Sequence, residues 1–546
     1  MSQQTLQAPA DAAAWLSATV DGCVAALADR VTVKGKLSRE RLDALQAEAF
    51  ELARTLAERE AARAMLAYAE RLGDPLSAGL AATYVALVTR RMLERLLPGG
   101  AFYGAAAATL PEAVAAFLQQ AGSPEQLLAL SELLYERTAE PTGPLGLGSD
   151  HREMRDLFAR FADEKLAPVA EHIHRDDMVV PEPLLKELAA LGVFGISIPE
   201  SYGGSFVDHL TMCIATEELS RGSLGAGGSV ITRPEICSKA ILGGGTEEQK
   251  ATWLPEIASG ERLVSVAVTE PNAGSDVAAV RVSARKVEGG YLINGEKTWC
   301  TFAGRADTFV LLARTGRLED GPKGLTMFLA EKPAVIGGDE SSFRHAQPGG
   351  GTVEGHAIPT IGYRGMHSFA VQFEDYFVPD SHRVGREGEG FALQMKGFAG
   401  GRIQTAARAV GVMEAAYRQA ISYARDRQVF GEPLANFGLS RQKLVLMAAM
   451  IQASRQLSYH VAGLMDDHKG GMEASLVKLL SCKDAEWVTR EAMQLHGGMG
   501  YSEEYAVSRL WQDARVLSIF EGAEEILAVY VVARGVLREK IEGVAG

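Results

Sequence analysis

The chain has 546 residues, a formal net charge of −14 at pH 7 and an apolar content of 47%. A chain of this length is expected to hold about three or four domain-sized units. Its acidic balance argues against binding to nucleic acid or to an anionic membrane surface, because both attract basic protein faces. The five cysteines include no Cys-x-x-Cys pair, so neither a metal site nor a disulfide framework is predicted.

The N-terminal residues lack the basic start and apolar core of a secretory signal. No apolar run approaches the length of a membrane span. Scattered cysteines are typical of a reducing compartment. These features predict a cytoplasmic protein that does not contact a membrane.

Residues 1–148 are predicted to form a helical extension that ends in a linker. Apolar side chains recur there at roughly helical spacing, at Leu42, Leu45, Phe50, Leu52 and Leu56. The segment Glu140–Gly148 is rich in glycine and proline and is the predicted linker. Asp150 is then expected to cap a new helix. The apolar stripe of that helix is formed by Met154, Leu157, Phe158 and Phe161.

Three further domains are expected: a helical domain over 149–262, a β-domain over 263–386 and a helical domain over 387–546. Strands are predicted at Leu263–Thr269, Tyr291–Asn294, Thr308–Ala313 and Ala370–Phe373. Because no helical segments separate these strands, an antiparallel sheet is expected. The glycine-rich segment Gly337–Gly355 is predicted to be a mobile loop. The predicted fold class is α+β, mainly α.

Three motifs lie within this organisation. They are Val-Thr-Glu-Pro-Asn-Ala-Gly-Ser-Asp-Val at 268–277, Gln-Leu-His-Gly-Gly-Met-Gly-Tyr at 494–501 and Ser-Ile-Phe-Glu-Gly-Ala-Glu-Glu-Ile-Leu at 518–527. Together they resemble the acyl-CoA dehydrogenase family, and the order helix, sheet, helix over 149–546 is similar to its architecture. Residues 1–148 fall outside the resemblance. The implied fold is a helical domain, an antiparallel β-domain and a C-terminal helical bundle, preceded by an extra helical extension.

The resemblance implies that Glu521 is the general base that removes the α-proton of an acyl thioester. A lone acidic residue at a helix start has a structural explanation, because the helix dipole favours it there; the accompanying motifs give the assignment its weight. Oxidation of the thioester also needs a hydride acceptor that no side chain provides. No convincing G-x-G-x-x-G follows a predicted strand. The FAD cofactor is therefore implied by the resemblance alone.

Flavin contacts are implied in two segments of the β-domain. Those of the first segment are Val266, Val268, Thr269, Gly274 and Ser275. In the second, the Trp299 indole would cover one flavin face and the Thr301 hydroxyl would lie near flavin N5. The structural alternatives are a plain Pro-Asn-Ala-Gly turn and a core tryptophan.

Further FAD contacts are implied across a subunit interface, at Arg427, Phe430, Gln494, Gly497 and Gly498. The fork-shaped guanidinium of arginine suits a phosphate. A solvated arginine at a helix end and a simple turn between helices are the alternatives. Because these contacts involve a neighbouring subunit, the resemblance implies a homo-oligomer, either a dimer or a tetramer.

The residues expected to contact the thioester substrate are Ser275, Arg402, Thr232, Arg233 and Gly522. Arg233 is unusual in a helix that should face the acyl tail. It could bind a substrate carboxylate, or point to solvent or to an internal acid. The length, the extension and the altered motifs look most like a branch acting on short, α-methyl-branched dicarboxylic acyl-CoA. A general short- or branched-chain acyl-CoA dehydrogenase is the alternative.

The chain departs from the family's pattern at several positions, among them the segment 436–442, which replaces the common Phe-Gln-x-x-Gln. Ala399 stands where an aspartate is common, and Ala523 and Glu525 stand where Thr or Ser and Gln are common. The CoA contact near Arg402 and the adenine end of FAD are therefore expected to be remodelled.

The reduced cofactor is expected to pass its electrons to an electron-transferring flavoprotein. An acyl-CoA oxidase, which uses O₂ instead, stays open as an alternative. A DNA-associated flavoprotein is a remote alternative that the acidic balance disfavours.

Overall fold

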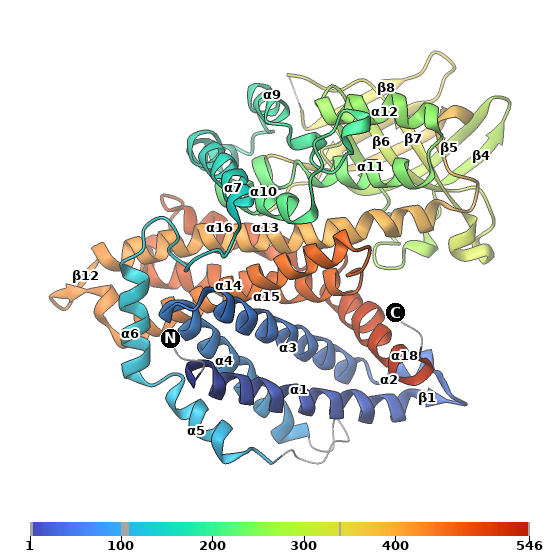
Figure 1. Ribbon diagram of the computed structural model, residues 1–546. Helices are drawn as coiled ribbons and strands as arrows, with labels where there is room; N and C mark the ends of the chain where they lie inside the picture. Colours follow the sequence, from blue (N-terminus) through green and yellow to red (C-terminus); the bar gives the residue numbers. More distant parts are fainter. Residues whose placement is uncertain (1–3, 100–108, 338–339, 544–546) are drawn as a thin grey trace. The chain divides into compact units, whose positions relative to one another are not determined.

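A computed structural model of the chain describes residues 4–99, 109–337 and 340–543 (Figure 1). The chain divides into two compact units. Unit 1 joins Met1–Glu153 to Thr405–Gly546, and unit 2 is Met154–Gln404. Helices dominate the described residues and one large sheet lies in unit 2, so the predicted α+β class, mainly α, is confirmed.

Helices form the first half of unit 2. They are α7 (Ser149–Phe161, which begins in unit 1), the π-turn η1 (Ala162–Leu166), α8 (Ala167–Arg175), α9 (Glu182–Ala190), α10 (His209–Gly222), the π-turn η4 (Leu224–Gly228), α11 (Thr232–Gly244) and α12 (Glu247–Ser259). Arg155 of α7 donates from Nε to the carboxylate of Glu218 in α10 at 2.8 Å. The predicted cap at Asp150 is wrong, because the helix already begins at Ser149 and Asp150 lies in its first turn.

Within the described residues the sheet holds nine strands. They are β3 (Val264–Ala267), β4 (Ser283–Val287), β5 (Gly290–Thr301), β6 (Thr308–Arg314), β7 (Leu325–Glu331), β8 (Ser342–Ala346), β9 (Thr352–Ala357), β10 (Ser368–Pro379) and β11 (Arg383–Val384). Their order is β11-β7-β6-β4-β5-β10-β9-β8, and β3 pairs with β6. The pairs β3–β6 and β4–β6 are parallel and the others antiparallel, so the expected antiparallel sheet is found with two parallel exceptions.

The predicted loop at Gly337–Gly355 is wrong where β8 and the start of β9 form a hairpin. Residues 338 and 339 of the predicted loop lie outside the described residues. Phe343 explains the difference. It is 8% exposed and lies 5.8 Å from Phe369 between ring centroids, so one buried aromatic side chain anchors an otherwise polar strand.

Unit 1 combines the N-terminal extension with the C-terminal helices. The extension holds α1 (Gln4–Val31), β1 (Thr32–Val33), β2 (Lys36–Leu37), α2 (Arg39–Ala44), α3 (Gln46–Leu72), α4 (Pro75–Gly99), α5 (Glu112–Gln120) and α6 (Pro124–Tyr135). The C-terminal part holds α13 (Gly390–Asp426, which begins in unit 2), β12 (Gln428–Val429), β13 (Glu432–Pro433), α14 (Gly438–Asp466), α15 (Glu473–Leu495), α16 (Ala506–Leu517), α17 (Glu524–Ile526), the π-turn η10 (Leu527–Ala533) and α18 (Arg534–Glu542). Helix α3 packs against both α14 and α15 (Figure 1), so the extension is part of the same helical bundle.

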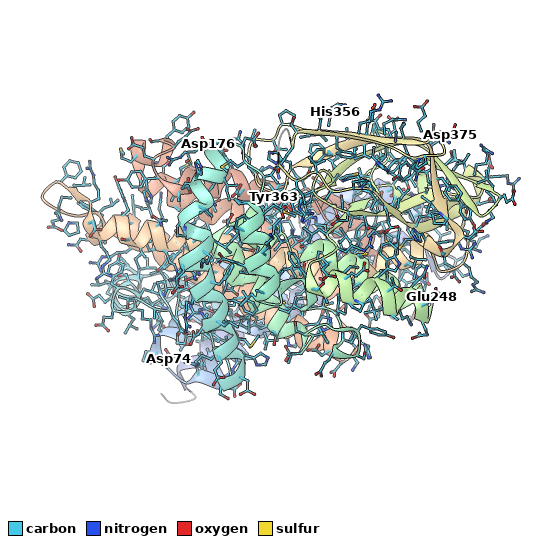
Figure 2. The ribbon with its side chains drawn as sticks, turned by 90° about the horizontal axis from the view of Figure 1, so that it is seen from above. Asp74, Asp176, Glu248, His356, Tyr363 and Asp375 are labelled. Atoms are coloured by element: carbon cyan, nitrogen blue, oxygen red, sulfur yellow. The ribbon has the colours of Figure 1, made fainter. Side chains whose placement is uncertain are left out.

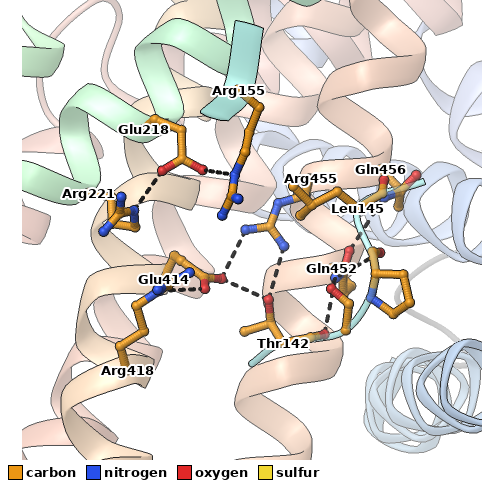
Figure 3. A network of polar contacts seen from close by, with 12 residues as sticks. Thr142, Leu145, Arg155, Glu218, Arg221, Glu414, Arg418, Gln452, Arg455 and Gln456 are labelled. Carbon is orange, nitrogen blue, oxygen red and sulfur yellow. Dashed lines mark hydrogen bonds and ion pairs between the residues drawn. The ribbon is translucent and has the colours of Figure 1, made fainter. Parts of the chain in front are cut away.

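The end of the extension is held by a polar network (Figure 3). The Thr142 hydroxyl donates to Glu414 at 2.7 Å, and Arg455 donates to the same carboxylate at 3.0 Å. Gln452 donates to the Thr142 carbonyl oxygen at 3.1 Å, and Gln456 to that of Leu145 at 3.1 Å. The segment proposed as a linker is therefore fixed to α13 and α14.

Charge pairing within this network outweighs the cost of burial. Burial alone would raise the pKa of Glu414, but Arg455 and Arg418 lower that pKa to about 2. Glu414 is thus ionised and paired at physiological pH.

Asp484 of α15 makes the stability of the bundle depend on pH. Burial raises its pKa to about 7, while Arg91 opposes the rise, Glu58 reinforces it and a hydrogen bond from Ser454 opposes it. A carboxyl whose folded pKa is raised gives stability that is complete below its unfolded pKa of about 4. That stability is lost as the pH rises through about 7.

We therefore expect Asp484→Asn to have a higher thermal midpoint than the wild-type protein at pH 8 and a nearly equal one at pH 4.5. Thermal denaturation at several pH values measures the difference. An Asn variant that is equally destabilised at both pH values would contradict the assignment.

Candidate active site

The two segments predicted to face the flavin meet in unit 2. The turn after β3 is joined to β5 by a hydrogen bond of 2.9 Å from the Thr298 N–H to the Thr269 carbonyl oxygen. Val268 is buried and Val266 partly buried, whereas Gly274 and Ser275 are exposed at the tip of the turn. The turn therefore presents backbone and hydroxyl groups outward from a buried base.

Trp299 is an unusual strand residue. Its φ is +59°, which only a few per cent of non-glycine residues adopt, and 54% of its surface is exposed. The core alternative is therefore not supported. Two residues on, Thr301 is 8% exposed, and its hydroxyl lies 2.9 Å from the Ser368 hydroxyl. An exposed indole beside a fixed hydroxyl and outward-facing backbone groups fits a flat, hydrogen-bonding ring such as isoalloxazine.

Thr232 and Arg233 begin helix α11 and are 0% and 5% exposed. Arg233 Nη1 donates to the Ser229 carbonyl oxygen at 2.9 Å, and the guanidinium carbon lies 5.9 Å from the ring centroid of Tyr363, which is labelled in Figure 2. In the part of the chain that the structure describes, no carboxylate lies within ion-pair distance of Arg233, so neither alternative for it, solvent or an internal acid, is met. The Ser229 and Thr232 hydroxyls are buried and lack a hydrogen-bond partner among the same residues.

Arg402 lies on α13 and is half-buried. Two residues earlier, a Cβ on Gly400 would lie 2.2 Å from Glu235 Oε1, so glycine there makes room for a fully buried carboxylate. The predicted CoA contact of Arg402 stays a prediction.

Glu521 lies in unit 1, in the loop between α16 and α17. Its φ is +53° and that of Gly522 is +99°, so two successive residues hold conformations that favour glycine. Lys478 Nζ of α15 donates to the Gly522 carbonyl oxygen at 2.5 Å. Next to the loop, the Arg408 guanidinium lies 4.7 Å from the Phe520 ring centroid. These contacts fix the loop and leave Glu521 partly exposed.

The residues predicted to reach a neighbouring subunit's FAD are exposed on unit 1. They are Arg427, Phe430, Gln494, Gly497 and Gly498. Phe430 is 95% exposed, which is unusual for a large apolar side chain. Tyr423 and His496 stack with ring centroids 4.2 Å apart, so the end of α13 and the end of α15 are held together.

Three groups that hold predicted site residues were missed by sequence reasoning: Ser368, Lys478 and Lys297. Only Lys297 left a signal. Ile293 and Lys297 are an even number of residues apart on β5, so period-two alternation places a lysine on the buried face. The other two contacts join distant parts of the sequence and left no local pattern.

Among the described residues there is no group of three or more histidine, cysteine, aspartate or glutamate side chains that could hold a metal ion. No described helix is both long enough and apolar enough to cross a membrane.

Three family models match the chain in order. They are the acyl-CoA dehydrogenase N-terminal domain over residues 148–261, the middle domain over 265–376 and the C-terminal domain over 388–537. The chain belongs to the acyl-CoA dehydrogenase family. The predicted family, fold and enzyme class, an FAD-dependent oxidoreductase, are confirmed.

Among relatives, the (2S)-methylsuccinyl-CoA dehydrogenase of Cereibacter sphaeroides is 38% identical over 541 residues, which cover 96% of this chain and 97% of that protein. Two solved structures each align with a TM-score of 0.66 and 32% identity over 72% of this chain and 99% of theirs. One is the butyryl-CoA dehydrogenase of Megasphaera elsdenii, and the other is a chain from the electron-transferring flavoprotein structure of Acidaminococcus fermentans. Because the alignment with the Cereibacter sphaeroides protein covers 96% of this chain, it must include most of the N-terminal extension, which lies outside the family models.

Proposed function

We propose that this chain oxidises (2S)-methylsuccinyl-CoA to mesaconyl-CoA, a step of the ethylmalonyl-CoA pathway. The observation that carries the proposal is the buried Arg233 guanidinium, which has no carboxylate partner among the described residues. The 38% identity that extends through the N-terminal extension supports the same substrate.

The electrostatics of Arg233 favour an anionic ligand. A buried cation without a counter-charge costs several kcal/mol in desolvation, about 3–5 kcal/mol when a partner is removed. A carboxylate on the substrate's β-carbon would supply that counter-charge through a two-pronged hydrogen bond. The unpartnered hydroxyls of Ser229 and Thr232 would offer further donors. Butyryl-CoA has no group that could satisfy this cation.

The chain's own residues define the chemistry. Glu521 would take the proton from the thioester's α-carbon as general base. Donors at the thioester oxygen, among them the Glu521 N–H implied by the family, would stabilise the charge that develops there. Val268, Thr269, Ser275, Trp299 and Thr301 would hold the flavin. When bound, FAD supplies the acceptor for the β-hydride, so that a proton and a hydride leave and a C=C double bond forms.

The electron acceptor is proposed to be an electron-transferring flavoprotein, and the working form a homo-oligomer. The exposed Phe430 and Tyr501, 95% and 84% exposed, support a surface that another subunit covers. Light scattering measures the oligomeric state, and a monomer would contradict it. Rapid O₂ consumption during turnover would instead favour the oxidase alternative.

The substrate proposal predicts a selective defect in Arg233→Met. The KM for methylsuccinyl-CoA should rise about 30-fold or more, because a buried charge loses its partner, while the KM for butyryl-CoA should change little. Lys239→Met, which removes another cation from the same helix, is the matched control and should alter neither value. Equal effects of Arg233→Met on both substrates would refute the role of Arg233.

A further inference from the structure

We propose that Glu270 and Lys297 are positioning residues for FAD: they form a buried charge pair that holds Val266–Ser275 and Trp299–Thr301 in the arrangement that receives the flavin. The inference deepens the proposed function and rests on it, because it takes FAD as the ligand of these two segments.

Lys297 connects the two segments directly. It lies on β5, two residues before Trp299, and is 0% exposed. Its Nζ donates to the Val268 carbonyl oxygen at 2.9 Å and to Glu270 Oε1 at 2.8 Å. One ammonium group therefore ties the strand that carries the exposed indole to the turn that carries the exposed hydroxyl.

Glu270 links the two ends of the loop 270–282. Its carboxylate accepts hydrogen bonds from the Arg281 N–H at 2.6 Å and the Val282 N–H at 2.8 Å, in addition to the bond from Lys297. Two backbone bonds between Glu270 and Ala273, of 3.1 and 3.0 Å, make the turn tight. The carboxylate thus joins the beginning of the loop 270–282 to its end.

A second buried cation holds the far end of this loop. Arg314, 7% exposed, donates from Nε to the Val280 carbonyl oxygen at 2.8 Å and from Nη2 to that of Ala278 at 2.7 Å. By contrast Gly274 and Ser275 at the tip are exposed. The loop has a rigid, charged base and a free tip, which is the arrangement expected of a ligand-binding turn on a fixed scaffold.

A role in stability alone does not account for this pair. Burial lowers the pKa of Lys297 while Glu270 opposes that shift, so removing these charges from water has a real cost. Replacing a buried ion pair by neutral side chains of similar size is often neutral or stabilising. A buried charge pair fixes the geometry around it, because its hydrogen-bond donors and acceptors must lie at defined positions to satisfy both charges. In this protein the groups held in this way belong to the two flavin-facing segments and the end of the loop 270–282.

The double variant Lys297→Met/Glu270→Gln separates positioning from stability. It removes both charges together. The single Gln oxygen can still accept from one of the Arg281 and Val282 N–H groups, which bond to different oxygens of Glu270. The thermal midpoint of the apoprotein should fall only slightly, because one backbone N–H loses its acceptor, while the dissociation constant for FAD rises about tenfold or more. The visible circular dichroism of bound flavin should also change. Lys297→Met alone should lower the thermal midpoint further than the double variant does, because it leaves a buried carboxylate without its cation.

Lys332→Met is the matched control. Lys332 is another buried lysine, directly after β7, but its Nζ donates to the carbonyl oxygens of Gly304, Ala306 and Pro333, outside both flavin-facing segments. It should leave the FAD dissociation constant unchanged. A double variant that binds FAD as the wild type does would overturn the proposal.

If the double variant does not fold, Glu270→Gln alone is used for the same measurements. Wild-type FAD affinity and circular dichroism in that variant would also overturn the proposal. A wild-type protein that binds no FAD would instead refute the proposed function. Lys297→Arg keeps the charge and should recover part of the FAD affinity lost in Lys297→Met.

Discussion

Glu521→Gln is expected to keep its fold and its bound FAD and to lose about 10²–10⁴-fold of its turnover, because a neutral amide cannot remove the α-proton. The loop that carries Glu521 is fixed by Lys478 and by two residues with positive φ. Gln has nearly the same shape as Glu, so these contacts should persist in the variant. The measurement is the rate of flavin reduction by substrate after anaerobic mixing.

Glu525→Gln is the matched control for this variant. Glu525 is exposed and lies four residues beyond Glu521, so removing its charge should leave the rate of flavin reduction near that of the wild type. A Glu521→Gln variant that retains more than about a tenth of the wild-type rate would mean that another group is the base.

Deletion of residues 1–148 is expected to abolish soluble, folded protein. The extension and the C-terminal helices form one compact unit, and α3 and α4 pack against α14. Deletion would expose the apolar surfaces that these helices cover in α14 and α15, and large exposed apolar patches cause aggregation. The yield of soluble protein and its circular dichroism measure the outcome. A truncated protein that stays soluble and folded, with an unchanged thermal midpoint, would contradict the account.

Arg455→Met should weaken the attachment of the extension without removing it. It leaves the buried Glu414 carboxylate without its more buried cation, which should cost about 3–5 kcal/mol of unfolding free energy. Arg418→Met is the matched control, because Arg418 is the more exposed partner of Glu414 and should cost less. Equal losses in the two variants would argue against a buried clamp on residues 142–145.

Local patterns predicted much of the architecture from the sequence. Short β-rich runs between turns marked β5, β6 and β10. The roughly helical spacing of Phe50, Leu52 and Leu56 marked α3, whereas Leu42 belongs to the separate short helix α2. The β8–β9 hairpin was not predicted, because a single residue, Phe343, packs into the core while the residues around it are glycine or polar. The packing of the extension onto α14 and α15 could not be predicted, for a different reason. An amphipathic stripe shows that a helix needs a partner but does not say which one.

In the candidate site, too, the residues within motifs were predicted and the contacts between distant segments were not. The motifs gave Glu521, Thr269 and Trp299 by resemblance, and the structure adds their backbone conformations and neighbours. The sequence could not show whether Arg233 had an internal acid partner, because a pairing of that kind depends on which helices come together. The same is true of the contacts from Ser368 to Thr301 and from Lys478 to Gly522.

Anaerobic bleaching of the flavin by a panel of thioesters tests the central proposal most directly. The panel contains methylsuccinyl-, butyryl-, isobutyryl-, glutaryl- and octanoyl-CoA. We expect rapid loss of the yellow absorbance with (2S)-methylsuccinyl-CoA and slow or no loss with the four others. Equally rapid bleaching by butyryl- or isobutyryl-CoA would contradict a site built around a substrate carboxylate.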